Sequence, residues 1–201
     1  MIKALIFDLG GVIVPFDFRR GYALMQERCS IPAEEIPKRI GGTDLVRRFE
    51  TGEVGSREFV GELCGVLGTD LNYDEFCRIW YSIFLPHTLI DDEMIAALAE
   101  RYRLVLLSNT NQIHFEMLDE GYPILRHFKR RVLSYKVGAM KPSPVIYEAA
   151  IAEAGCKPGE CFFTDDVEPY VEGARQAGID AVQFHNRDQL IRDLRTRGIE
   201  W

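Results

Sequence analysis

No apolar run in this sequence of 201 residues approaches the roughly 20 residues that a membrane-spanning helix needs. The first residues lack the basic segment, apolar segment and small-residue cleavage site of a signal peptide. The sequence also has no low-complexity segment, internal repeat or long linker. We therefore expect a cytoplasmic protein with no membrane partner.

Cysteine is scarce: there are five, an odd number, and no two of them form a Cys-x-x-Cys motif. This pattern argues against a disulfide scaffold or a zinc site and favours reduced thiols. Basic residues are outnumbered, with 24 Lys and Arg against 31 Asp and Glu. The resulting net charge of −7 provides no basic surface for a phosphate backbone, so we expect no nucleic-acid partner.

A buried strand is predicted at residues 4–7, which form an uninterrupted apolar run that ends at Asp8. Gly10 and Gly11 allow a tight turn just beyond it. Ligands of open parallel sheets bind at the carboxyl ends of the strands, which makes Asp8 a candidate catalytic group. Taken alone, an Asp-x-Gly-Gly segment is more often a solvated Asp that opens a turn.

Helical periodicity dominates residues 17–85, where apolar residues form four stripes and no strand is indicated. Ser56 is the expected N-cap of one helix, and Asn72 with Glu75 resembles a capping box. Because this helical unit follows the strand that carries Asp8, we expect it to form a lid over that edge of the sheet.

Helix and strand patterns alternate after residue 87, which predicts an α/β fold with a Rossmann-like parallel sheet covered on both faces. We divide the chain into a core domain of residues 1–15 and 87–201 and a helical cap domain of residues 16–86. The further strands are expected at residues 104–107, 131–135, 161–164 and 181–184.

Polar side chains follow three of the predicted strands and one loop. Each has a simpler explanation by itself, as a helix cap or a solvated loop residue. Only their order and their shared place at the strand ends point to a common site. The candidates are Asp8 after the first strand, Ser108 and Asn109 after the second, Lys141 in a loop, and Asp165 and Asp166 after the strand that follows it.

Three carboxylates at one edge of a sheet repel each other unless a cation neutralises them. Mg²⁺ prefers such hard oxygen ligands and completes its octahedron with water and substrate phosphate. Lys141 and the donors of Ser108 add sites for an anion. The pattern predicts phosphoryl transfer, with a carboxylate as the nucleophile.

Four motifs of the chain resemble those of the haloacid dehalogenase superfamily of phosphatases, and the resemblance covers essentially the whole chain. Residues 17–85 match the helical cap of one branch, the C1 cap. The matching motifs are Phe7–Val12, Leu107–Asn109, Lys141–Pro142 and Phe163–Asp166.

Within that branch the chain is most similar to bacterial sugar-phosphate phosphatases of the α-D-glucose-1-phosphate type. The segments that carry this closer resemblance are Glu50–Glu53, Ser108–Asn111 with His114, and Met140–Pro142. The resemblance implies a Mg²⁺-dependent phosphatase of a small phosphorylated metabolite, a sugar phosphate such as a hexose 1-phosphate. We expect a monomer or a homodimer.

The resemblance also implies a role for each candidate residue. Asp8 would attack the phosphorus atom and form an aspartyl-phosphate. Asp8, the backbone carbonyl of Gly10 and Asp166 would hold Mg²⁺, with Asp165 acting directly or through water. The side chains expected to bind the transferred phosphoryl group are Ser108, Asn109 and Lys141.

Three positions depart from the family pattern. Gly10 stands where most of these phosphatases carry the Asp that protonates the leaving group. Loss of a general acid costs about 10²–10⁴ in rate, so an anomeric sugar phosphate, acyl phosphate or aryl phosphate fits better than a simple alkyl phosphate. Pro15 replaces a frequent Asp near the start of the cap, and Tyr170 replaces a frequent Asn or Asp behind the metal.

Two other functions remain open at this point. A metal-independent 2-haloacid dehalogenase uses the same nucleophile, although Asp165 and Asp166 would repel a haloacid anion. A catalytically impaired phosphate-binding or partner-binding protein would explain the three departures. His114 is interpreted as a structural histidine more readily than as a proton donor. Solvated positions are expected for most of the cap arginines Arg19, Arg20, Arg47 and Arg48.

Overall fold

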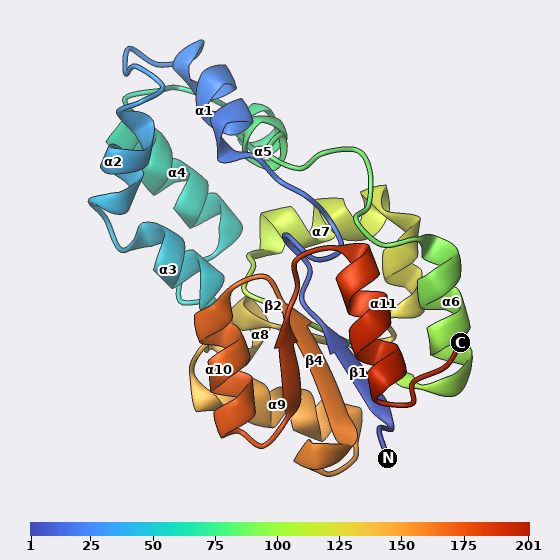
Figure 1. The fold of residues 1–201 in the computed structure, drawn as a ribbon. Helices are drawn as coiled ribbons and strands as arrows, with labels where there is room; N and C mark the ends of the chain where they lie inside the picture. The colour runs from blue at the N-terminus through green and yellow to red at the C-terminus, as the bar shows by residue number, and fades with distance from the viewer.

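Five parallel strands form the sheet of the computed structural model, which describes residues 1–201 (Figure 1). Their order is β3-β2-β1-β4-β5, so the first strand lies at the centre. The predicted Rossmann-like α/β fold is confirmed. The strands are β1 (Ala4–Phe7), β2 (Arg103–Ser108), β3 (Arg130–Leu133), β4 (Cys161–Asp165) and β5 (Asp180–Gln183).

The side chains of β1 alternate between two hydrophobic clusters, one on each face of the sheet. Leu5 and Phe7 pack in one cluster, and Ala4 and Ile6 in the other. Both faces of the strand are therefore buried, which explains its unbroken apolar sequence. On the face of Leu5 pack α6 (Asp92–Arg101), α7 (Gln112–Gly121) and α11 (Arg187–Thr196), and on the face of Ile6 pack α9 (Pro144–Ala154) and α10 (Glu168–Gln176).

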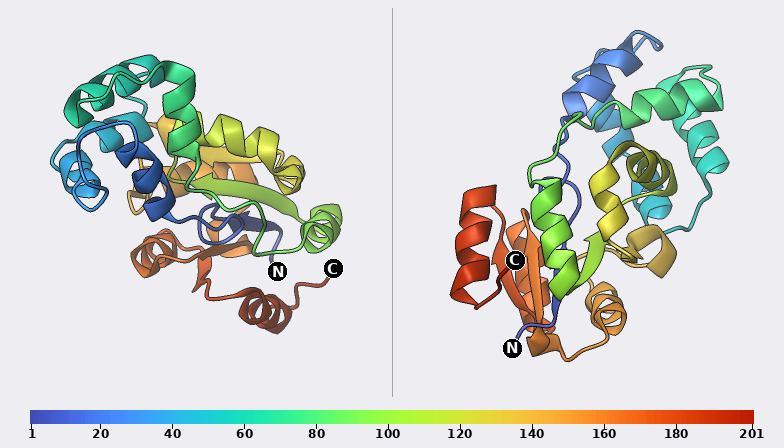
Figure 2. Two further views of the ribbon diagram at one scale, coloured as in Figure 1. Left: turned by 90° about the horizontal axis from the view of Figure 1, so that it is seen from above. Right: turned by 90° about the vertical axis from the view of Figure 1, so that its right-hand side faces the viewer.

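Five helices between β1 and α6 form a lobe beyond the carboxyl ends of the strands (Figures 1 and 2). The rings of Phe49 and Phe59 stack in the core of this lobe, and Phe76 meets Phe59 edge to face. Ile113 of α7 packs in the same cluster, which joins the lobe to the sheet layers. Its helices are α1 (Phe18–Gln26), α2 (Ile36–Gly41), α3 (Leu45–Glu50), α4 (Ser56–Leu67) and α5 (Tyr73–Tyr81).

Local sequence signals predicted most elements correctly, and the capping box of Asn72 and Glu75 is confirmed at the start of α5. Three predictions differ from the structure. Ser56 is the first residue of α4 and not its N-cap, because its hydroxyl instead donates to Gln112 of α7, 3.0 Å away. Helix α2 was not predicted. The strand expected to extend to residue 135 ends earlier, and the segment after it is helix α8 (Ser134–Val137), with short 3₁₀ helices at η1 (Pro123–His127) and η2 (Pro158–Glu160).

The register of the sheet decides which side chains meet. Phe7 pairs with Leu106 of β2 on one side and with Thr164 of β4 on the other. The residues that follow these three therefore emerge at the same edge, below the cap helices. No helix of the structure is both long enough and apolar enough to cross a membrane.

Candidate active site

Lys141 joins two of the strand-end carboxylates. Its ammonium nitrogen lies 2.6 Å from Oδ1 of Asp8 and 2.5 Å from Oδ2 of Asp165. All three side chains are almost completely buried. The structure thus brings together the residue that follows β1, the last residue of β4 and a lysine of the loop before α9, as the sequence predicted.

Burial and charge work against each other in this cluster. The pKa of Asp8 is raised to about 7, because burial and the charge of Asp165 together outweigh the opposing attraction of Lys141. Burial alone would lower the pKa of Lys141, but attraction by Asp8 and Asp165 prevails and raises it above its ordinary value. Lys141 therefore stays charged and holds one oxygen of Asp8 in place.

A third carboxylate completes an acidic group. Asp8, Asp165 and Asp166 each offer an oxygen, and these oxygens lie within 4.8 Å of one another. Burial, followed by repulsion from Asp165, raises the pKa of Asp166. No side chain donates a hydrogen bond to the Asp166 carboxylate, and no hydrogen bond reaches the carbonyl of Gly10. This set of hard, unsaturated oxygen donors fits Mg²⁺.

Gly11 shapes the space beside Asp166, a relationship that sequence analysis missed. Its φ of 79° lies in the left-handed region, and a Cβ at this position would come within 2.4 Å of Asp166 Oδ2. Only glycine adopts this backbone conformation without strain and also leaves room for the Asp166 carboxylate. The Gly-Gly pair in the sequence was the one signal of this close approach.

Both polar atoms of the Asn109 side-chain amide are engaged by the backbone of Lys141. Its side-chain oxygen accepts from the backbone N–H of Lys141 at 2.8 Å, and its side-chain nitrogen donates to the Lys141 carbonyl at 3.1 Å. Ser108 is buried at the end of β2, and its hydroxyl makes only a long 3.4 Å bond to the neighbouring carbonyl. That phosphate binds to Asn109 and Ser108 stays a prediction.

Aromatic rings surround the ammonium of Lys141. Its nitrogen lies 5.1 Å from the ring centroid of Tyr170 and 5.7 Å from that of Phe163. The Tyr147 hydroxyl fixes the segment by donating to the Tyr170 carbonyl at 2.6 Å. Tyr170, a departure from the family pattern, thus contributes a cation–π contact to the lysine rather than a polar group.

His114 uses both ring nitrogens within the protein. Nε2 lies 3.0 Å from the Trp80 carbonyl of α5, and Nδ1 lies 3.2 Å from the Asn111 amide. Burial lowers the pKa of His114 to about 4, so the ring is neutral near pH 7 and donates from Nε2 to Trp80. The ring also stacks on Trp80. His114 is therefore the structural histidine that the sequence favoured, and it ties the cap to α7.

A cavity of about 400 Å³ lies between this edge of the sheet and the cap. Gly10, Ser108 and Asn109 line it, which places the cavity next to the segments that carry Asp8 and Lys141. Phe16 also lines it, and a Cβ on Gly10 would come within 3.1 Å of the Phe16 ring. An aromatic ring therefore flanks residue 10, the position at which the family resemblance leads one to expect a general acid.

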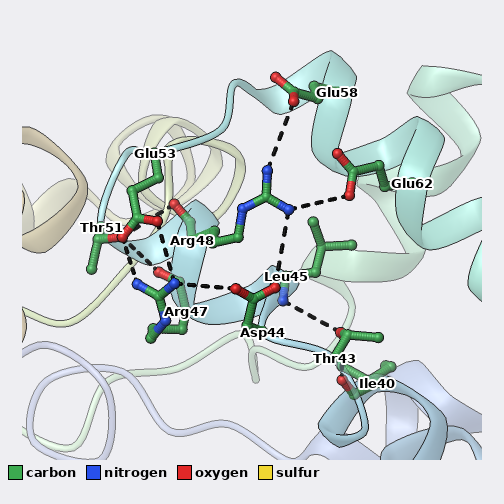
Figure 3. Close-up of polar contacts among 10 residues, drawn as sticks. All are labelled: Ile40, Thr43, Asp44, Leu45, Arg47, Arg48, Thr51, Glu53, Glu58 and Glu62. Carbon is green, nitrogen blue, oxygen red and sulfur yellow. Dashed lines mark hydrogen bonds and ion pairs between the residues drawn. The ribbon is translucent and has the colours of Figure 1, made fainter.

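The cap arginines are paired or exposed away from the cavity, as expected. Arg47 bonds with Glu53 and Asp44, and Arg48 reaches Glu58 and Glu62 (Figure 3). None of the four lines the cavity. The remaining two are Arg19, which pairs with Asp17, and Arg20, which donates to the Ser82 carbonyl.

Comparison with known proteins gives a consistent result. Residues 2–178 match the family model described as haloacid dehalogenase-like hydrolase. A D-ribitol-5-phosphate phosphatase of Bacteroides thetaiotaomicron is 28% identical over 92% of this chain and 93% of its own length. A phosphatase of Mycobacterium tuberculosis is 29% identical over 98% of this chain and 95% of its own.

Solved structures resemble the chain across both lobes. A haloacid dehalogenase family enzyme of Bacteroides thetaiotaomicron in complex with magnesium superposes with a TM-score of 0.82 at 26% identity, covering 95% of this chain and 98% of that one. The same enzyme with magnesium and inorganic phosphate gives a TM-score of 0.80 at 26% identity, over 92% and 96% of the two chains. A hydrolase of Porphyromonas gingivalis gives 0.82 at 26% identity over the full length of both chains.

Proposed function

The chain belongs to the haloacid dehalogenase-like hydrolases, and from this premise we propose that it cleaves a small phosphomonoester through a phosphorylated Asp8. It is a phosphoric monoester hydrolase that uses Mg²⁺. Its substrate is a small phosphorylated metabolite. One observation carries the assignment of residues: Lys141 bridges Asp8 and Asp165 beside a third, unbonded carboxylate, Asp166.

The carboxylates divide into two roles in this proposal. The metal would be held by Asp8, Asp166 and the Gly10 carbonyl, because the latter two have oxygens free of side-chain hydrogen bonds. The two oxygens of Asp165 accept hydrogen bonds from Lys141 and from the backbone N–H of Val167, the latter 2.9 Å away. The main role of Asp165 is therefore to hold the lysine in place. Bound Mg²⁺ supplies charge neutralisation for the phosphoryl oxygens.

The chain's own residues then carry the two displacements. An oxygen of Asp8 attacks phosphorus, the bond between phosphorus and the ester oxygen breaks, and the alcohol leaves with a proton taken from solvent. Water attacks the phosphorus of the aspartyl-phosphate, the bond to Asp8 breaks, and phosphate leaves with the regenerated carboxylate. Lys141 and Ser108 bind the phosphoryl oxygens throughout. Asn109 keeps Lys141 in position.

The leaving group must depart without help from residue 10. With Gly10 beside Phe16, no carboxyl stands at that position to protonate the ester oxygen. We therefore expect substrates whose alcohol leaves readily: anomeric sugar phosphates such as a hexose 1-phosphate, acyl phosphates or aryl phosphates. The domain division at residues 15/16 and 86/87 is part of this proposal, with the cap contributing the wall above the phosphoryl group.

Phosphate release from p-nitrophenyl phosphate, acetyl phosphate and a panel including hexose 1-phosphates tests the proposal. We expect turnover that requires Mg²⁺ and falls by about 10³-fold or more in Asp8→Asn. Asp70→Asn, at an exposed position with no ion pair, is the matched control and should retain full activity. Full activity of Asp8→Asn would refute the mechanism, and metal-independent chloride release from a 2-haloacid would favour the dehalogenase.

A further inference from the structure

The cavity above the carboxylate cluster is apolar over most of its wall. Thirteen of its 23 lining residues are hydrophobic, and no lysine or arginine is among them. A second phosphate or a carboxylate on the substrate would find no cationic partner there. The apolar wall in the cap includes Phe18, Met25, Ile36, Ile40, Val46 and Trp80.

Two polar side chains of this wall, those of Thr43 and His114, use their polar atoms within the protein. The Thr43 hydroxyl donates to the Ile40 carbonyl at 2.8 Å and accepts from the N–H of Leu45. His114 uses both ring nitrogens. In the cap part of the wall a polyol would find the Tyr22 hydroxyl and the Glu50 carboxyl as free partners. Each further hydroxyl left unpaired would cost roughly ten- to a hundredfold in affinity.

Glu50 carries the one carboxyl among the residues that line the cavity. It lies one helical turn after Val46 on α3, and both residues line the cavity. No hydrogen bond or ion pair engages its carboxyl, since Arg47 and Arg48 of the same helix turn to other acids (Figure 3). A carboxyl largely enclosed by apolar groups, without a partner, faces the space that the substrate must fill.

We propose that the cavity binds a predominantly apolar organic group of the phosphomonoester, an aromatic or branched hydrocarbon, and that Glu50 selects a hydroxyl on that group. This inference rests on the proposed function, because the phosphoryl group must reach Asp8. Continuity supports it: Gly10, Ser108 and Asn109 line the same cavity as Glu50. It also narrows the candidate substrates, since an aryl phosphate satisfies both the apolar wall and the missing acid at Gly10.

The first experiment compares 2-phenylethyl phosphate with D-ribitol 5-phosphate, which are both esters of primary alcohols and so differ mainly in polarity. We expect kcat/KM at least about tenfold higher for the apolar ester. Val46→Thr adds a hydroxyl to the wall at nearly constant shape and should reduce this preference. Val145→Thr makes the same change at an exposed site on α9 and should not.

The second experiment tests Glu50 with 2-phenylethyl phosphate and its 3- and 4-hydroxyphenyl analogues. The wild type should prefer at least one hydroxylated ring by about tenfold, as expected for one hydrogen bond to the Glu50 carboxyl. Glu50→Leu should abolish that preference, and Glu50→Gln should keep part of it. An equal loss in Glu50→Leu on all three esters would show a merely structural residue and overturn this assignment.

These experiments distinguish a failure of the apolar-substrate proposal from a failure of the proposed phosphatase function. Turnover of D-ribitol 5-phosphate as efficient as that of 2-phenylethyl phosphate would overturn the apolar selection while leaving the phosphatase intact. Absence of Mg²⁺-dependent phosphate release from every ester, including p-nitrophenyl phosphate, would instead contradict the proposed function.

Discussion

Asn109 holds the backbone of Lys141 from both sides, accepting from its N–H at 2.8 Å and donating to its carbonyl at 3.1 Å. The two residues are 32 positions apart in the chain. This pair of bonds fixes the start of the loop whose lysine reaches Asp8. Asn109 therefore has a structural route to catalysis that does not require contact with substrate.

Asn109→Asp should lower kcat by about 10- to 100-fold, because an aspartate keeps the acceptor for the Lys141 N–H but loses the donor to its carbonyl. Asn109→Ala should lower it further. If Asn109 acts only by positioning Lys141, the inhibition constant of inorganic phosphate, measured with each variant, should change no more than in Lys141→Arg. A selective loss of phosphate affinity in Asn109→Ala would instead support direct binding to the phosphoryl group.

Gly11→Ala should weaken Mg²⁺ binding. The added Cβ would come within 2.4 Å of Asp166 Oδ2, so the carboxylate has to move away from its place beside Asp8. Titration of activity with Mg²⁺ should show a half-saturating concentration raised by about tenfold or more.

Gly68→Ala is the matched control for backbone strain. Gly68 also has a positive φ, of 63°, but no atom lies within 4 Å of the added Cβ. Both variants should lose about 1 kcal/mol of folding free energy from the left-handed conformation. Equal Mg²⁺ dependence in the two variants would mean that the Gly11 contact does not position Asp166.

Strand placement was accessible from sequence because it depends on local patterns. The apolar run at residues 4–7 and the polar residues that follow each strand are visible without a structure. Parallel pairing then implies that the strand ends share one edge, as the registers of Phe7 with Leu106 and Thr164 show. The proximity of Asp8 and Asp165 follows from this topology, whereas the place of Lys141 also depends on the loop before α9.

Side-chain orientation within loops was not accessible in the same way. Nothing in the sequence near Asn109 indicates that its amide turns to Lys141, or that the ring of Phe16 lies against Gly10. The same holds for the ring of Tyr170 beside the lysine. These contacts depend on how separate loops pack, whereas helix and strand patterns depend on neighbours within the same segment.

Gly10→Asp should restore protonation of the leaving group. Gly10 has no positive φ, so an aspartate is compatible with the backbone, and the Phe16 ring has to move by a few tenths of an ångström to admit the new Cβ. We expect kcat for alkyl phosphates to rise by about 10- to 100-fold, with little change for p-nitrophenyl phosphate, whose leaving group needs no proton.

Gly10→Asn is the matched control for this gain, since it has the same shape without an acid. A Gly10→Asp/Phe16→Ala double variant keeps the test meaningful if the ring blocks the new side chain. An equal rise of kcat for alkyl phosphates in Gly10→Asp and Gly10→Asn would show that the absence of an acid at residue 10 does not limit the rate. No rise in the Gly10→Asp/Phe16→Ala double variant would show the same.

Glu50 should make the stability of the fold depend on pH in a defined window. Burial raises the pKa of Glu50 from its ordinary value of 4.5 to about 7. Between these pH values the folded protein holds a proton that the unfolded chain has released, so stability falls as pH rises. The other charged and titratable groups on or near α3 are Tyr22, Asp44, Arg47, Arg48, Glu53, Glu58, Glu62, His114, Tyr135 and Lys136.

Glu50→Gln removes that ionisation and should raise Tm at pH 8 by roughly 2–6 °C, while leaving Tm at pH 4.5 nearly unchanged. Glu53→Gln is the matched control with the opposite sign. Arg47 and Thr51 lower the pKa of Glu53, so its contribution is present at pH 8 and is lost as pH falls. Thermal unfolding of the three proteins from pH 4.5 to 8 measures both effects. A Tm of Glu50→Gln that follows the wild type at every pH would mean that Glu50 is already paired or solvated, and it would remove the basis for placing a substrate hydroxyl against it.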